Sequence, residues 1–241
     1  MSATALIAAA GSGQRLGAGG PKAFATVAGR PLLAWSLEAA TAASSIDAIV
    51  VAAPGGDGCE RAIELIAALD GVEADVVAGG ATRAESVSAA LEWTGTEFVL
   101  VHDAARPLAQ PELFDAIVER LERSPSADAV IAAVPVADTL KRAGARSTAA
   151  GLGEVPSVLE TVSRADLWAA QTPQGFRVDR LREAQQQAQD RGELVDATDE
   201  ARLIEQAGGK VLLQPASPSN IKVTTPDDLA LAEALLEARP R

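Results

Sequence analysis

The chain has 241 residues, of which 48% are hydrophobic, 22% are charged and only 3% are aromatic. Its formal net charge of -12 argues against a nucleic-acid-binding protein, because such proteins usually carry a broad basic surface. No apolar run approaches the ~20 residues of a membrane-spanning helix, and no basic residue precedes Arg15 as a secretory signal would require. The single cysteine, Cys59, can neither close an internal disulfide nor build a thiolate metal site. We therefore expect a cytoplasmic protein with no membrane or nucleic-acid partner.

Short apolar runs alternate with amphipathic stretches over the first half of the chain. Runs that are apolar throughout are typical of strands covered on both faces. The alternation predicts an α/β fold with a doubly wound, mostly parallel sheet and right-handed crossovers. The predicted strands are Thr4–Ala10, Ile46–Ala53, Val72–Ala78, Glu97–His102 and Ala127–Val134. The predicted helices between them are Leu32–Ala43, Cys59–Leu69, Arg83–Trp93 and Pro111–Arg123.

This alternation stops after Val134. Residues Pro135–Val162 show no helical pattern, and Leu140 and Val155–Leu159 flank a small-residue segment like the two sides of a long hairpin. We expect a single domain, residues 1–241, from which residues 135–163 project as a β-arm. Beyond the arm the sequence predicts helices at Val178–Gln189, Asp199–Ala207 and Pro226–Leu236, and short strands at Lys210–Gln214 and Asn220–Val223.

A glycine-rich loop follows the first predicted strand, in the segment Ala8–Gly17 (AAAGSGQRLG). Its glycine spacing departs from the G-x-G-x-x-G of dinucleotide-binding folds, and no acidic residue stands ~20 positions on, which disfavours a nicotinamide-dependent oxidoreductase. Lys22 follows Pro21 and precedes Ala23, so the loop does not match a Walker A motif either. What is distinctive is the pair of cations, Arg15 and Lys22. Two fixed cations beside a glycine loop suit a triphosphate, because they stabilise the charge that builds up as pyrophosphate departs.

Polar residues also follow the third and fourth predicted strands. Asp103 and Arg106 would emerge at a carboxyl end of the sheet, where open α/β folds bind ligands. Asp103 could there hold Mg²⁺ or substrate hydroxyl groups, and Arg106 an anion, whereas we interpret the lone His102 as a packing or hydrogen-bonding residue. The glycines of Gly79–Ser86 could admit a base or ribose, although an ordinary loop with a helix N-cap at Thr82 explains the same residues.

Taken together, these segments resemble the 2-C-methyl-D-erythritol 4-phosphate cytidylyltransferase family of the non-mevalonate isoprenoid pathway. The similarity covers nearly the whole chain in the family's order, so the combination is far more specific than any single motif. One departure is visible: some relatives carry an acidic residue after the Gly79-Gly80 pair, where this chain has Ala81. The matching segments are Ala9–Leu16, Pro21–Lys22, Gly79–Val87, Val101–Pro107, Asp138–Arg142, Thr161–Trp168, Thr172–Gln174, Thr198–Glu200 and Asn220–Thr224.

The resemblance implies a Rossmann-like nucleotidyltransferase fold and a homodimer whose subunits interlock through the β-arm. It implies an enzyme that joins CTP to 2-C-methyl-D-erythritol 4-phosphate, a small polyol phosphate, releasing pyrophosphate, with Mg²⁺ or another divalent cation as cofactor. By position, the resemblance assigns catalysis and substrate-phosphate positioning to Arg15, Lys22, Arg164 and Lys222. It assigns nucleotide binding to Ala9, Ala10, Gly11, Gly13, Gly80, Arg83 and Ser86. It assigns the substrate or metal shell to Asp103, Arg106, Thr139, Thr172 and Thr198, with Asp103 as the candidate metal ligand and the metal held mainly by the triphosphate.

The implied chemistry fits the residue types present. The nucleophile is a phosphate oxygen of the substrate that is already ionised at neutral pH, so no general base is required. Two alternatives stay open. A ribitol-5-phosphate cytidylyltransferase would share the fold and the chemistry, because the sequence does not report the carbon skeleton of the acceptor. A nucleotide-binding regulator without turnover would need less charge at the leaving group than Arg15 and Lys22 provide.

Overall fold

A central sheet organises the residues described by the computed structural model, which are 2–17, 20–149, 153–194 and 198–239. Seven strands build it: β1 (Ala3–Ala8), β4 (Ile46–Ala53), β5 (Asp75–Ala78), β6 (Phe98–Asp103), β7 (Ala129–Pro135), β10 (Trp168–Arg177) and β11 (Val211–Pro215). Their order across the sheet is β11-β7-β10-β6-β1-β4-β5. β1 pairs in parallel with both β4 and β6, and the β4–β5 and β7–β11 pairs are also parallel. The mostly parallel sheet predicted from the sequence is therefore confirmed.

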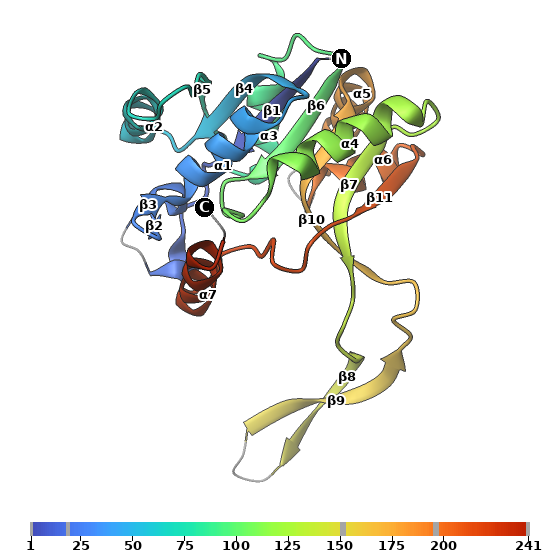
Figure 1. Cartoon of the computed structure of the whole chain (residues 1–241). Helices are drawn as coiled ribbons and strands as arrows, with labels where there is room; N and C mark the ends of the chain where they lie inside the picture. Colours follow the sequence, from blue (N-terminus) through green and yellow to red (C-terminus); the bar gives the residue numbers. More distant parts are fainter. Residues whose placement is uncertain (1, 18–19, 150–152, 195–197, 240–241) are drawn as a thin grey trace.

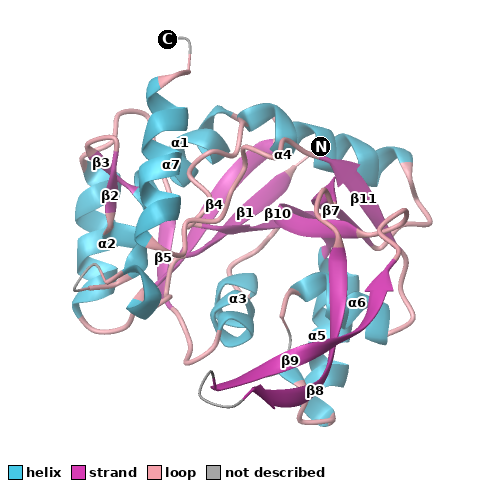
Figure 2. Cartoon of the chain, turned by 90° about the horizontal axis from the view of Figure 1, so that it is seen from below, coloured by secondary structure: helices cyan, strands magenta, loops and turns pink. Residues whose placement is uncertain are grey.

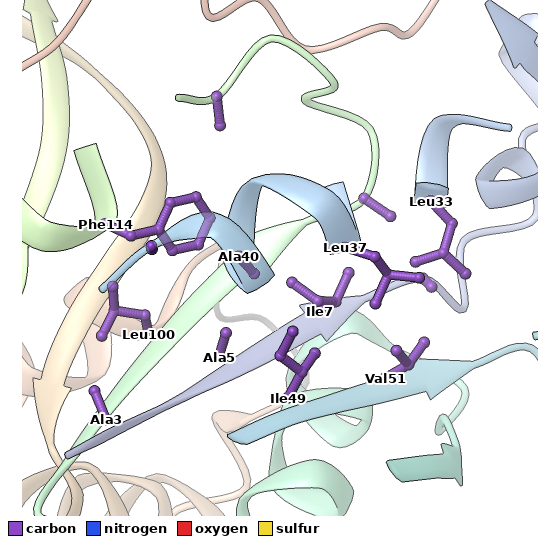
Figure 3. Close-up of a cluster of buried hydrophobic side chains, with 14 of the residues drawn as sticks. Ala3, Ala5, Ile7, Leu33, Leu37, Ala40, Ile49, Val51, Leu100 and Phe114 are labelled. Atoms are coloured by element: carbon purple, nitrogen blue, oxygen red, sulfur yellow. The ribbon is translucent and has the colours of Figure 1, made fainter. Parts of the chain in front are cut away.

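Helices cover both faces of this sheet (Figure 2). On one face lie α1 (Leu32–Ala42), α2 (Asp57–Ala67) and α4 (Pro111–Arg123). On the other lie α3 (Arg83–Leu91), α5 (Val178–Asp190) and α6 (Glu200–Gln206). Successive side chains of a strand point to opposite faces. Figure 3 shows the result, since Ala3, Ala5 and Ile7 of β1 lie on the side of α1 and of Phe114, whereas Leu6 belongs to the core on the other face.

A third apolar cluster lies beside the first loop and holds the end of the chain against it. α7 (Pro226–Glu237) contributes Ala232 and Leu236, which are buried together with Leu16, Val27 and Val223. The small hairpin of β2 (Thr26–Val27) and β3 (Arg30–Pro31) belongs to the same region, as do the short 3₁₀ turns η1 (Gln14–Leu16) and η2 (Lys22–Phe24). The cluster therefore fastens the loop after β1 to the segment that precedes α7.

The sequence did not predict β10, which lies antiparallel between β6 and β7. Its residues include Pro173 and Gly175, which weaken an ordinary strand pattern. The pairing with β7 shifts register between Ala170 and Gln174, and this irregularity accommodates the proline. The short strand predicted at Asn220–Val223 is wrong, because that segment is irregular.

A separate two-stranded sheet projects from the body of the molecule (Figure 1). It consists of β8 (Leu140–Ala149) and β9 (Gly153–Val162), paired antiparallel, with the intervening residues 150–152 of the predicted arm outside the described range. Val155, Val158 and Leu159 of β9 are exposed by 57%, 63% and 68%. The hairpin thus carries apolar side chains that its own chain leaves uncovered. No helix in the described ranges is long and apolar enough to cross a membrane.

A substitution at Gly175 tests how tightly β10 packs beneath α4. A Cβ atom at Gly175 would lie 2.4 Å from Cγ2 of Ile117 and 3.0 Å from Cδ1 of Leu121, both fully buried. We expect Gly175→Ala to lower the free energy of unfolding by about 1–3 kcal/mol, the scale of overpacking in a core. Gly95→Ala, where a Cβ meets nothing within 4 Å, should change it by less than about 0.5 kcal/mol. Denaturant unfolding curves measure both, and equal stabilities for the two variants would contradict the packing described.

Candidate active site

A cavity of about 600 Å³ lies where the loops after β1, β5 and β6 meet the segment before α7. These loops follow the carboxyl ends of parallel strands, the usual place for a ligand in an open α/β sheet. Four cationic side chains of the described ranges line it, together with one carboxylate, that of Asp103. The cations are Arg15, Lys22, Arg83 and Lys222. The cavity therefore has the charge and the volume for a phosphorylated ligand.

The loop after β1 folds back on itself and thereby brings its two cations to the cavity. The backbone N–H of Lys22 donates to the carbonyl of Gly11 at 3.1 Å. Gly13 has a φ of +70°, and a Cβ there would lie 3.0 Å from the Cβ of Lys22, so both the backbone conformation and the close approach require glycine. Leu16 is buried in the third apolar cluster. Arg15 and Lys22 are thus placed by a closed loop that is anchored at one side.

The loop after β5 forms another wall of the cavity. Thr82 is the N-cap of α3 and forms a capping box with Glu85, which confirms the ordinary explanation that the sequence offered for this loop. The hydroxyl of Ser86 donates to the carbonyl of Thr82 at 2.8 Å and accepts from the N–H of Gly80 at 3.1 Å. Gly79 packs so closely on Ala10 that a Cβ would lie 2.5 Å from the Cβ of that alanine. Ser86 therefore shapes this wall through backbone contacts as well as lining it.

Asp103 is a buried carboxylate at the centre of a network of charged side chains. Its Oδ1 accepts from Nε of Arg83 at 2.9 Å, and its Oδ2 accepts from Nζ of Lys222 at 2.6 Å. Arg83 also donates from Nη1 to Oε2 of Glu200 at 2.6 Å. Burial alone would raise the pKa of Asp103, but the charges of Arg83 and Lys222 hold it well below its usual range. Asp103 is therefore ionised throughout the physiological range.

Lys22 lies half-buried among other cations. Burial lowers the pKa of its ammonium group to about 8, and the positive charges of Lys222 and Arg15 contribute to this shift, against the opposing effect of Asp103. The protein thus holds together charges that repel one another. A polyanion in the cavity would relieve that repulsion and restore the protonated form of Lys22.

His102 does not face the cavity. It is completely buried, packs against the ring of Phe114, and its Nδ1 lies 3.1 Å from Oγ1 of Thr172. Burial lowers the pKa of the imidazole to about 4, so it is neutral at physiological pH. The interpretation of His102 as a packing and hydrogen-bonding residue is confirmed.

The sequence-predicted site residues divide into two groups in the structure. All seven predicted nucleotide-binding residues line the cavity, and so do Arg15, Lys22, Lys222 and Asp103. The others do not line it: Arg106, Thr139, Arg164, Thr172 and Thr198. Within this single chain, the cavity therefore gathers the predicted nucleotide side and only part of the predicted acceptor side.

Each residue of the second group has a different environment. Arg106 donates from Nη1 to the carbonyl of Asn220 at 2.7 Å, and Thr172 is buried, where its hydroxyl accepts from the N–H of Asp103 at 3.0 Å. These two side chains bind neighbouring parts of the protein in this structure. The other three are exposed, two of them where the arm joins the body and one beside the start of α6: Thr139, Arg164 and Thr198.

Sequence reasoning gave no individual role to Thr224 or to Glu200. Thr224 lines the cavity, and its hydroxyl donates to Oδ2 of Asp228 at 2.5 Å. Glu200 does not line the cavity, but its carboxylate accepts a hydrogen bond from Arg83, which does. Both lie inside segments that the sequence had marked, next to Lys222 and Thr198 respectively, but nothing in the local pattern indicated their contacts.

A doubly wound sheet with a cation-lined, glycine-walled cavity at the carboxyl ends of its strands defines a nucleotidyltransferase fold and site. Comparison with known proteins makes this specific. The family model for 2-C-methyl-D-erythritol 4-phosphate cytidylyltransferase matches residues 3–238. The chain belongs to the 2-C-methyl-D-erythritol 4-phosphate cytidylyltransferase family, and it is therefore a transferase of the isoprenoid pathway, as the sequence segments predicted.

Individual relatives agree over nearly the full length. The 2-C-methyl-D-erythritol 4-phosphate cytidylyltransferase of Synechococcus sp. (strain CC9902) is 46% identical over 238 residues, which cover 97% of each chain. The crystal structure of the enzyme of that name from Thermus thermophilus has a TM-score of 0.76 at 35% identity, covering 99% of this chain and 100% of the other. The 4-diphosphocytidyl-2C-methyl-D-erythritol synthase of Anaerococcus prevotii DSM 20548 has a TM-score of 0.79 at 28% identity, covering 98% of each chain. The similarity therefore includes the arm as well as the sheet.

The burial of Lys22 among other cations predicts that its positive charge lowers the stability of the folded protein. Its folded-state pKa of about 8 lies below the ordinary 10.5, so folding disfavours the protonated form. Stability is therefore reduced below pH 8, rises as the pH increases between these two values, and is restored above 10.5. We expect Lys22→Met, without ligands, to melt a few degrees higher than the wild type at pH 7 and at nearly the same temperature as the wild type at pH 10.5.

Thermal unfolding of both proteins at the two pH values measures this effect. Lys210→Met is the matched control, because Lys210 is exposed next to the edge strand β11, away from the cavity. It should not melt higher than the wild type at pH 7 as Lys22→Met is expected to do. A Lys22→Met protein that is less stable than the wild type at pH 7 would contradict the argument.

Proposed function

We propose that this chain joins CTP to 2-C-methyl-D-erythritol 4-phosphate, giving 4-diphosphocytidyl-2-C-methyl-D-erythritol and pyrophosphate. The observation that carries the chemistry is the convergence of Arg15, Lys22 and Lys222 on one cavity despite their mutual repulsion. Such a site is preorganised for a reaction between two anions. The identity of nucleotide and acceptor rests on the family to which the chain belongs.

In the proposed reaction, an ionised phosphate oxygen of the acceptor attacks the α-phosphorus of CTP. A new oxygen–phosphorus bond forms, and the bond from the α-phosphorus to the oxygen that bridges to the β-phosphorus breaks. The electron pair leaves with pyrophosphate. Arg15 and Lys22 stabilise the charge on the leaving group, and Lys222 holds the acceptor phosphate in line for attack. No proton has to move during this step, which agrees with the burial of His102 away from the cavity.

The nucleotide would lie between the two glycine-rich walls. Ala9, Ala10, Gly11 and Gly13 supply one wall, and Gly80, Arg83 and Ser86 supply the other. The glycine and alanine residues among them have no bulky side chain and leave room for a base and ribose to approach the backbone. Because Ala81 offers no carboxylate, contacts to the nucleotide at that position fall to the backbone or to neighbouring residues such as Arg83.

The residues at the cavity fit a divalent cation that arrives with the triphosphate. Within the described ranges no cluster of three His, Cys, Asp or Glu side chains could hold a metal, and Asp103 is the one carboxylate that lines the cavity. Magnesium bound to a nucleotide typically takes one or two protein carboxylates and several phosphate oxygens. We therefore propose Asp103 as the protein ligand, and because its two oxygens accept hydrogen bonds from Arg83 and Lys222, the metal would share this carboxylate with both cations. When bound, Mg²⁺ would neutralise part of the phosphate charge.

We further propose that the enzyme is a homodimer formed through the β-arm. An isolated two-stranded hairpin is marginally stable in water, and Val155, Val158 and Leu159 are exposed in the single chain. A second copy that covers these side chains would stabilise the arm. Arg164 and Thr139 flank the arm and lie outside the cavity of their own chain, so a crossing arm would bring them to the site of the other subunit.

Measuring pyrophosphate release tests the proposed reaction. CTP with 2-C-methyl-D-erythritol 4-phosphate and Mg²⁺ should react with a far higher kcat/KM than CTP with ribitol 5-phosphate. Equal or reversed values would favour the ribitol-5-phosphate enzyme. No release from any pairing of nucleoside triphosphate and acceptor would favour a binding protein without turnover.

Lys22→Met should lower kcat by roughly 100-fold or more, the scale for losing one electrostatic donor, whereas the control Lys210→Met should keep its activity.

Mixing two inactive variants tests the arm. Lys22→Met and Arg164→Ala proteins are unfolded together and refolded, so that half of a statistical mixture consists of mixed dimers. If the arm carries Arg164 into the site of its neighbour, each mixed dimer has one doubly damaged site and one intact site. Activity should then recover to roughly a quarter of the wild-type value, as two-fold symmetry requires. If Arg164 serves its own chain, every site keeps one lesion. Absence of recovery, with mixed dimers confirmed by mass, would rule out a shared site.

A further inference from the structure

Glu200 is a buried carboxylate that the proposed reaction does not use. It is the first residue of α6 and is 0% exposed. Its Oε2 accepts from Nη1 of Arg83 at 2.6 Å, while its Oε1 has no hydrogen-bond partner in the described part of the chain. Burying a carboxylate with one oxygen unsatisfied costs free energy, and a buried ion pair seldom repays that cost in stability. Its geometry therefore points to a role other than holding the fold together.

The contact extends through a chain of charges to the cavity. Glu200 binds Arg83, Arg83 binds Asp103 through Nε, and Asp103 binds Lys222. These residues come from α6, α3, β6 and the segment before α7, so no single element fixes their arrangement. Glu200 and Asp103 engage Nη1 and Nε of the same guanidinium, which fixes the plane of that group.

One guanidinium nitrogen of Arg83, Nη2, is available to a ligand. Within the described ranges no residue accepts a hydrogen bond from Nη2 of Arg83, although Arg83 lines the cavity. A long arginine side chain that is free to rotate would lose entropy on binding a ligand, and an arginine held on two sides has already lost it. The two carboxylates also offset the charge of Arg83, so its contribution lies in directed hydrogen bonds more than in long-range attraction.

We propose that Glu200 is a positioning residue for nucleotide binding: it locks Arg83 between itself and Asp103, so that Nη2 is presented to the nucleotide in the cavity. This inference deepens the proposed function and rests on it. Glu200 touches no ligand, and its effect on the acceptor is indirect, through Asp103 and Lys222. Loss of Glu200 should therefore weaken the binding of CTP more than that of the acceptor.

The test is Glu200→Gln, which keeps the shape of the side chain and removes its charge. We expect the Kd of CTP, measured by calorimetry with Mg²⁺ and no acceptor, to rise about tenfold, the scale of losing one charge-assisted hydrogen bond. The KM for CTP should rise with it, while the KM for 2-C-methyl-D-erythritol 4-phosphate changes by less than about threefold. A general loss of folded protein would not produce this difference between the two substrates.

Glu97→Gln is the matched control. Glu97 forms an ion pair with Arg177 at 3.1 Å. The Arg177 side chain is 23% exposed, the same fraction as the Arg83 side chain. Unlike Arg83, however, Glu97 and Arg177 do not line the cavity. This variant should bind CTP within about twofold of the wild type, as expected for a pair with one exposed partner. In an Arg83→Gln background, Glu200→Gln should cause no further loss of CTP affinity, because its effect passes through Arg83.

Several outcomes would overturn the inference. They are an unchanged or tighter Kd for CTP in Glu200→Gln, an equal rise in both KM values, or losses that add in the double variant. If Glu200→Gln does not fold, Glu200→Asp carries the test. It keeps the charge but shortens the reach to Arg83, and the same selective loss of CTP affinity is expected. A wild-type protein that binds no CTP would refute the proposed function itself, whereas a failure confined to the variants would refute only the role of Glu200.

Discussion

Repulsion between cations held at one edge of the sheet is the constraint on which the rest of this structure depends. Burial and the neighbouring charges of Lys222 and Arg15 lower the pKa of Lys22 to about 8, which means that folding works against the protonated form. Asp103 offsets part of that cost from the centre of the group. The remainder must come from the packing of the segments that carry the cations. An active site that stores unfavourable charge in this way trades stability for affinity toward polyanions.

The packing that holds these segments is local and apolar. Leu16 and Val223 are buried in one cluster, one beside Arg15 in the first loop and the other beside Lys222 in the segment before α7. Since apolar burial is non-directional, the hydrogen bond from Lys22 to Gly11 and the close fit of Gly13 must define the orientation. Cations held by backbone closure and core contacts need little rearrangement when a charge develops beside them, which is what electrostatic catalysis requires.

The sequence predicted those parts of the molecule that local pattern determines. Alternating apolar runs predicted the parallel strands. Arg15 and Lys22 stood out as two cations around the glycine-rich loop after the first strand, and Asp103 stood out because it directly follows the fourth predicted strand. The sequence did not predict β10, because Pro173 and its polar neighbours interrupt the strand pattern. The strand forms through its pairing with β6 and β7, which lie far from it in the sequence. The contact between Glu200 and Arg83 was equally unpredictable, because the burial of Glu200 depends on how α6 packs and its partner Arg83 lies 117 positions away. Contacts between distant segments leave no periodic signal in one sequence.

The two halves of the proposed reaction place different demands on the chain. The residues proposed to bind the nucleotide lie within one chain, since both glycine-rich walls and Lys22 line the same cavity. The acceptor half is different, because Arg164 and Thr139 lie at the base of an arm whose apolar side chains are uncovered. If the arm docks on a second copy, the interaction that covers Val155, Val158 and Leu159 also delivers these two residues. Dimerisation and recognition of the acceptor would then depend on the same apolar contact, so a substitution that weakens the arm would impair acceptor binding while leaving the nucleotide wall intact.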